Sequence, residues 1–115
     1  GMVGLLPGIC RLTDRLQSFG YKEVVSLRDS LLGKAGLRTR GHEFHYSIWE
    51  GRPADRSLYQ TLSSRGDESA EGYSVENLTA SYVNLHFDAC PQVPQALVEN
   101  AAAFRRQRQA LIKPL

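Results

Sequence analysis

The stretch LRTRGHEFHYSIW, residues 37–49, is the longest strand that the sequence predicts. In a strand, successive side chains point to opposite faces, so Phe44, Tyr46 and Ile48 share one face. Because all three are large and apolar, we expect that face to lie against a core.

Shorter predicted strands lie on both sides of this stretch, separated by Gly, Pro and Asn. Before it, strands are expected within residues 2–6, 9–17 and 21–27. After it, residues 58–62 and 73–75 form a predicted hairpin whose tip is the polar run at 63–69. Apolar residues then recur at helical spacing after Pro94, which predicts a helix over about 93–110.

Residues 80–87 alternate most clearly of all. Val83, Leu85 and Phe87 fall on one face of the predicted strand. The opposite face carries Tyr82 and His86, with Asn84 between them. We therefore expect a half-buried strand, within an α/β fold made of a strand-rich mixed sheet and a packed C-terminal helix.

Composition limits the classes of function. The chain has 115 residues, of which 42% are hydrophobic and 23% charged, as expected for one globular domain over residues 2–115, with Gly1 as a cloning remnant. A net charge of +2 is too small to predict nucleic-acid binding. No apolar run approaches the ~18 residues of a membrane span. Two widely separated cysteines predict neither disulfides nor a zinc motif, and favour a reducing cytoplasm.

His86 is the first candidate for chemistry, because it ends a predicted strand just before a turn into a helix. Active sites of open α/β sheets collect at such positions. An exposed imidazole there can take a proton from a thiol or hydroxyl and return it to a leaving amine. The alternative is a surface or structural histidine.

The block at residues 40–46 is dense in functional side chains. On a strand Glu43 and His45 share a face and His42 lies on the other, so the three do not converge without a bulge. Two histidines three apart on a strand are a poor zinc motif, and no metal site is predicted. Glu43 paired with His45, or with Arg40, is expected to form a structural polar network or a substrate contact.

The cysteines are weaker candidates. Cys10 lacks the closely following glycine of a nucleophile elbow, so we interpret Cys10 as a small hydrophobic residue, and Cys90 likewise. No Gly-rich phosphate loop occurs, so no cofactor is expected to bind this chain itself.

Several segments in order resemble the C-terminal part of cobyrinic acid a,c-diamide synthases, whose amidotransferase domain is of the cobyrinate and cobyrate synthase type. The resemblance covers most of residues 2–100. Its specific blocks are RGHEFHYS at 40–47 and SYVNLHF at 81–87. MVGLLPG at 2–8, FGY at 19–21 and LLG at 31–33 accompany them.

The resemblance implies the second part of a flavodoxin-like class I glutamine amidotransferase domain. The complete family enzyme uses ATP, Mg²⁺ and glutamine to amidate the a and c carboxylates of a cobyrinate-type tetrapyrrole in cobalamin biosynthesis. His86 corresponds to the base that deprotonates a catalytic cysteine. Arg40, His42, Glu43, His45 and Tyr82 are possible substrate contacts or active-site supports.

In the family, the nucleophilic cysteine precedes the MVGLLPG segment with which this chain begins, and the P-loop domain lies further upstream. We therefore expect the chain alone to be inactive and to require the Cys- and P-loop-bearing part, in the same polypeptide or as a separate chain. The alternative is a non-catalytic remnant that binds or self-assembles. In both cases an exposed sheet edge predicts a homo-oligomer.

Overall fold

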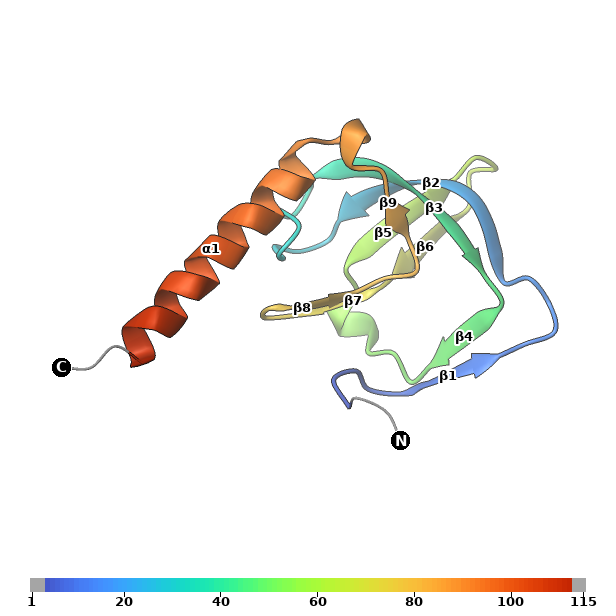
Figure 1. Cartoon of the computed structure of the whole chain (residues 1–115). Coiled ribbons are helices and arrows are strands. Elements are labelled where there is room, and N and C mark those ends of the chain that lie inside the picture. Colours follow the sequence, from blue (N-terminus) through green and yellow to red (C-terminus); the bar gives the residue numbers. More distant parts are fainter. Residues whose placement is uncertain (1–3, 113–115) are drawn as a thin grey trace.

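We describe residues 4–112 from a computed structural model of the chain (Figure 1). The main feature is a five-stranded sheet with the strand order β6-β5-β2-β3-β9. Its strands are β2 (Ser18–Ser26), β3 (Arg38–His45), β5 (Tyr59–Ser63), β6 (Glu68–Glu71) and β9 (Asn84–Leu85). The nine-residue β2 pairs with β3 on one side and with β5 on the other, so it organises the sheet.

Two small ribbons accompany this sheet. One pairs β1 (Ile9–Leu12) with β4 (Ser47–Glu50), and the other pairs β7 (Tyr73–Val75) with β8 (Leu78–Ala80). Single 3₁₀ turns occur at Ala54–Arg56 (η1) and Phe87–Ala89 (η2), and η2 leads into the 21-residue helix α1 (Gln92–Ile112).

The predicted class, a strand-rich α/β chain with a C-terminal helix, is confirmed. The helix expected at 93–110 is α1 (Gln92–Ile112). The strand pairs within residues 4–112 are all antiparallel, so the parallel component of the expected mixed sheet is not among them. Among the described side chains of α1, only Val93, near the start of the helix, is buried.

Two strand predictions were wrong in detail. A strand was expected at 2–6, but residues 4–6 are irregular, since Gly4 has a φ of 81°, which no strand uses. Residues 2 and 3 lie outside the described range. In the expected hairpin, β5 pairs with β6 rather than with residues 73–75. The polar segment of β6 is a strand because an edge position tolerates charged side chains.

The prediction for the buried face of β3 was also wrong. Phe44 and Tyr46 are exposed, at 54% and 41%, while Thr39 and Glu43 on the other face are buried. The cause lies in Gly41, which has no side chain and lets Val83 and the backbone of Asn84 pack directly on it. The core therefore closes on the face that carries the small and polar residues.

The core itself is small. Its centre consists of Val24, Leu58, Tyr59 and Val83, with Leu32 and Leu85 packed against it. The radius of gyration is 15.9 Å, whereas a compact domain of this length has about 13 Å. Figure 1 shows why: α1 projects away from the strands. No helix between residues 4 and 112 has the length and apolar character needed to cross a membrane.

Candidate functional site

His86 follows β9 and immediately precedes η2, as the sequence predicted. Its backbone N–H donates to the carbonyl oxygen of Arg40 at 3.0 Å, which continues the β3–β9 ladder by one residue. Since paired residues of neighbouring strands share a face, His86 and Arg40 lie on the same side of the sheet. The imidazole is exposed there and free to meet a reactant.

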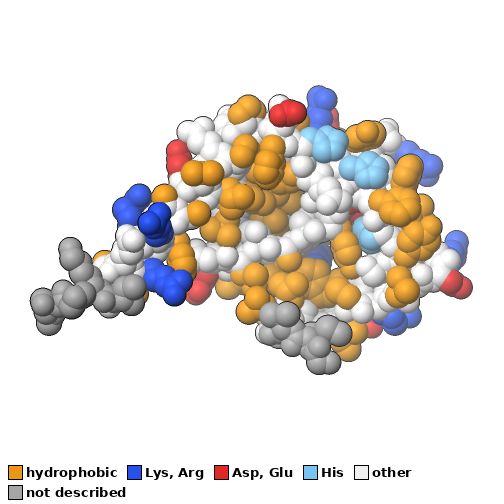
Figure 2. All heavy atoms as spheres, viewed as in Figure 1, with side chains coloured by type: hydrophobic (Ala, Val, Ile, Leu, Met, Phe, Trp, Pro, Cys, Tyr) orange, Lys and Arg blue, Asp and Glu red, His pale blue; other side chains and the backbone are white. Residues whose placement is uncertain are grey.

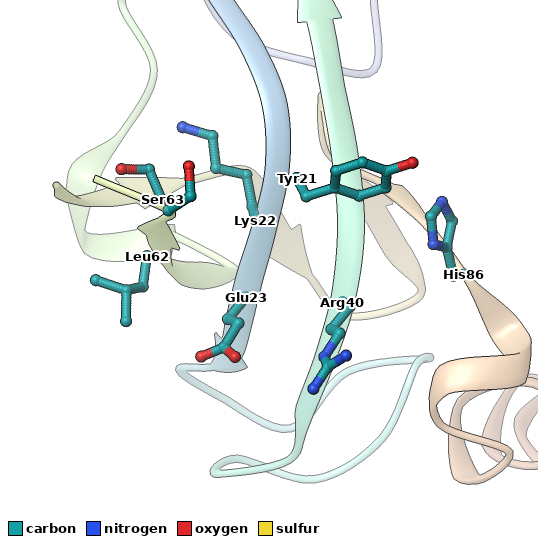
Figure 3. A pocket seen from close by; sticks show the side chains of 8 residues that line it. Tyr21, Lys22, Glu23, Arg40, Leu62, Ser63 and His86 are labelled. Carbon is teal, nitrogen blue, oxygen red and sulfur yellow. The ribbon is translucent and has the colours of Figure 1, made fainter. Parts of the chain in front are cut away.

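A groove of about 570 Å³ lies beside His86 (Figure 3). The Tyr21 ring reaches towards the imidazole, with 5.9 Å between ring centroids, and its other neighbour is His42 at 5.2 Å. Both cationic and anionic groups lie at the groove, so it suits a small polar zwitterion or carboxylate. The groove is lined by Tyr21, Lys22, Glu23, Arg40, Leu62, Ser63, Ser64 and His86.

The opposite face of β3 carries a second group of polar residues. His45 Nε2 lies 3.2 Å from Glu43 Oε2, and His45 Nδ1 lies 2.9 Å from the carbonyl oxygen of Ser47. A carbonyl oxygen only accepts, so Nδ1 carries a proton and donates to Ser47. The predicted Glu43–His45 pair is thus present, and Arg40 lies on the other face.

Tyr82 belongs to this second group. Its ring stacks on the His45 imidazole, and its hydroxyl lies 2.7 Å from Ser47 Oγ and 3.8 Å from Cys10 Sγ. Burial raises the pKa of the Tyr82 hydroxyl. The sequence predicted Tyr82 and His86 on one face of a single strand. They lie in different groups, because the chain is irregular between β8 and β9.

Glu71, at the end of β6, holds the segment that leads to His86. Its carboxylate accepts hydrogen bonds from Ser81 Oγ at 2.6 Å and from the Tyr82 backbone N–H at 2.7 Å. Burial raises the pKa of Glu71, and the nearby Glu43 carboxylate raises it further, against the lowering effect of these hydrogen bonds and of Arg52.

The structure therefore separates the six predicted site residues into two groups. Arg40 and His86 line the groove and His42 lies on the same face beside Tyr21, whereas Glu43, His45 and Tyr82 lie behind the sheet. This confirms the expected separation of His42 from the Glu43–His45 pair. Within the part of the chain that the structure describes, no three His, Cys, Asp or Glu side chains are arranged to hold a metal.

The two cysteines differ. Cys90 is 4% exposed, which agrees with its interpretation as a small hydrophobic residue. Cys10 is exposed on β1, and its thiol contacts Tyr82 rather than the groove.

Comparison with known proteins decides the family. Residues 1–92 match the model of the CobB/CobQ-like glutamine amidotransferase domain. The chain belongs to the CobB/CobQ-like glutamine amidotransferase family. The matched range contains all six predicted site residues and every strand of the sheet, but only the first residue of α1.

Curated relatives of this amidotransferase chain agree with the family model. The cobyrinate a,c-diamide synthase of Priestia megaterium is 35% identical over 108 residues, covering 94% of the chain and 23% of the relative. That of Listeria monocytogenes is 42% identical over 89 residues, covering 75% and 20%. That of Methanothermobacter thermautotrophicus is 34% identical over 104 residues, covering 90% and 23%. The chain thus spans about a fifth to a quarter of these relatives. No solved structure matches it.

Sequence reasoning missed two residues of the amidotransferase chain that the geometry brings forward. Tyr21 lies between His42 and His86, and there was a signal for it, because the FGY block at 19–21 is one of the segments that carry the family resemblance. Glu71 gave none, since a single acidic residue in a polar run has no distinguishing pattern.

Proposed function

We propose that this chain supplies the general base of the glutamine-hydrolysing site in a cobyrinate a,c-diamide synthase, and that His86 is that base. The observation that carries the proposal is the exposed imidazole of His86 at the end of β9, bordering a groove with cationic and anionic side chains. The family match supports it, because a glutamine amidotransferase domain must release ammonia from glutamine.

The proposed chemistry is acyl transfer. His86 takes a proton from a cysteine thiol on the adjoining polypeptide, and the thiolate attacks the side-chain amide carbon of glutamine. The proton then passes from His86 to the departing nitrogen, so that ammonia leaves and a thioester remains. Water, deprotonated by the same imidazole, hydrolyses the thioester to glutamate and regenerates the thiol.

The groove supports the binding of glutamine in this scheme. The guanidinium of Arg40 suits the α-carboxylate, while Glu23, its cross-strand neighbour, suits the α-ammonium group. His42 orients the Tyr21 ring at the entrance. Glu43, His45 and Tyr82 act from behind the sheet as supports of the segment before His86.

The other requirements of the reaction lie outside this chain. The proposal places ATP, Mg²⁺ and the tetrapyrrole in the adjoining polypeptide, where the resemblance puts the P-loop, and the ammonia is used there to amidate the a and c carboxylates. The isolated chain is then inactive, because it brings no thiolate to His86. The cytoplasm is the proposed compartment, since a free catalytic thiol requires reducing conditions.

The test is a chimera of the Priestia megaterium relative in which its matching segment is replaced by this chain. We expect the chimera to release glutamate from glutamine and the isolated chain to release none. His86→Asn in the chimera should lower kcat by about 10² to 10⁴, the usual contribution of a general base. Arg105→Gln, on the exposed part of α1, is the control and should leave the rate unchanged.

The alternative function, a non-catalytic module that binds or self-assembles, predicts a different result. A folded chimera that releases no glutamate, or one whose rate is indifferent to His86→Asn, would contradict the catalytic proposal. The thermal unfolding temperature of the variant is measured alongside, so that a loss of activity through unfolding is recognised.

A further inference from the structure

An unbroken line of aromatic rings crosses the outer face of β2 and β3 and ends at the proposed base. The rings touch edge to face, with centroid separations of 5.2 to 5.9 Å. Figure 2 shows hydrophobic and histidine side chains lying side by side over these strands. In order, this aromatic band consists of Tyr46, Phe44, Phe19, His42, Tyr21 and His86.

The band is open to solvent. Phe19 is 65% exposed and Tyr21 is 69% exposed. Cross-strand pairs such as Phe19 with Phe44 contribute only about 0.2–1 kcal/mol each, far less than burial of the rings could contribute. The core lies on the other face of β3, so the fold of this chain gives no reason for aromatic side chains here. Contiguous exposed aromatic surface is typical of an interaction site.

We propose that the aromatic band is the docking surface for the polypeptide that accompanies this segment in the synthases. The inference rests on the proposed function: the group activated by His86 must come within hydrogen-bond reach of it, so its carrier must cover the end of the band. The length of the relatives provides the occupant, since this chain covers only 23% of the Priestia megaterium protein.

A second copy of the chain fits the band less well. The four Phe and Tyr rings of the band, which are about half exposed, offer roughly 400–500 Å² of surface, given the 150–250 Å² of such a side chain. A stable interface needs about 800 Å² from each partner. A longer polypeptide can cover the band together with other exposed apolar residues, such as Ile9 and Leu12 on β1.

Hydroxyl-radical footprinting read by mass spectrometry tests this surface. The isolated chain is compared with the chimera, residue by residue. We expect Phe19, Tyr21, Phe44 and Tyr46 to be oxidised several-fold more slowly in the chimera. Tyr59, which is 1% exposed, should react slowly in both and reports that the chain is folded. Equal oxidation of the band in both proteins would overturn the inference.

The same samples separate this inference from the proposed function. Glutamate release with an unprotected band means that the catalytic proposal stands and the docking surface is wrong. A protected band without glutamate release means that the docking surface stands and the catalytic proposal is wrong. Protection in the isolated chain that increases with its concentration identifies a second copy as the occupant and overturns our choice. If Tyr59 becomes reactive in the chimera, the intact Priestia megaterium protein is used in place of the chimera. Its oxidation is then measured at the residues aligned with the band.

A substitution gives an independent measurement. Phe44→Ser should lower glutamate release by the chimera at least tenfold, while the isolated chain with this change unfolds within a few degrees of the unsubstituted one, because the ring is 54% exposed. Phe104→Ser, at a comparably exposed ring on α1, is the matched control. Unchanged activity with Phe44→Ser would count against the docking surface.

Discussion

The His45 imidazole and the Tyr82 ring stack face to face, with their centroids 3.8 Å apart and their planes 11° apart. This contact joins the middle of the sheet to the irregular segment between β8 and β9. Behind it, Glu43 holds the imidazole and Glu71 holds the backbone of Tyr82. The position of His86, four residues further along, thus depends on a set of contacts on the opposite face of the sheet.

The stacked pair should be energetically coupled. We expect His45→Ala and Tyr82→Ala each to destabilise the chain, and the double variant to cost less than their sum by about 0.5–1.5 kcal/mol. Urea unfolding of the four proteins measures this coupling. The pair Tyr82→Ala and Phe104→Ala, on distant elements, is the control and should be additive. Strict additivity for His45 and Tyr82 would show that the stacking contributes nothing.

Glu71 should make stability depend on pH. Burial raises its pKa above the ordinary value of 4.5, so the folded chain binds this proton more tightly than the unfolded chain. That stabilisation is complete below pH 4.5 and is lost as the pH rises through the folded-state pKa. The unfolding free energy of the unsubstituted chain, minus that of Glu71→Gln, should therefore fall with rising pH across this interval.

The control for this pH dependence is Glu68→Gln, an exposed glutamate on the same strand. The unfolding free energy of the unsubstituted chain, minus that of Glu68→Gln, should hardly change with pH. A difference for Glu71→Gln that rose with pH would mean that the carboxylate is stabilised, not destabilised, in the fold.

Sequence alone predicted α1 and most strands, because helical spacing and strand alternation are local signals. It placed the core on the wrong face of β3. Phe44 and Tyr46 are the most hydrophobic side chains there, and pattern reasoning follows hydrophobicity. The buried face is instead set by Gly41, through a contact with Val83 forty-two residues away, and such a long-range contact leaves no local pattern.

Gly41 should therefore not tolerate a side chain. A Cβ at this position would lie 2.3 Å from Val83 Cγ1 and 2.7 Å from the Asn84 carbonyl oxygen. We expect Gly41→Ala to destabilise the chain by about 1–3 kcal/mol, as overpacking does. Denaturant unfolding measures the loss, and adding Val83→Ala should offset part of it. If Gly41→Ala unfolds like the parent, β9 does not pack as described.

Arg52 should be irreplaceable by lysine. Its guanidinium donates to Ser57 Oγ at 2.6 Å and to the carbonyl oxygens of Gly72 at 3.0 Å and Ala70 at 3.3 Å. A lysine ammonium cannot reproduce this fork, so Arg52→Lys should cost about 1–2 kcal/mol in chemical unfolding. Arg56→Lys, at an exposed neighbour in η1, is the comparison and should change little. If Arg52→Lys and Arg56→Lys lowered the unfolding free energy equally, the forked hydrogen bonds of Arg52 would not be the cause.

The candidate site was predictable only in part. His86 could be found because the end of a strand before a helix is a recognisable position, and the SYVNLHF block strengthened it. The separation of His42 from Glu43 and His45 followed from strand alternation. The position of Tyr82 did not follow from strand alternation. The break between β8 and β9 lets its ring turn to His45, and that break follows from the hydrogen bonds of Glu71.

The projecting helix has a consequence for the dynamics of the chain. Along α1, Val93 is buried and Asn100 donates to the carbonyl oxygen of Leu31, but residues 104–111 are all exposed. None of these side chains is buried, so this outer part depends mainly on helix propensity, and isolated helices of its length are marginal in water. Its amide protons should exchange with solvent far sooner than those of β2. The chain thus has two levels of local stability, with the sheet as the slowly opening unit and the end of α1 unwinding independently of it.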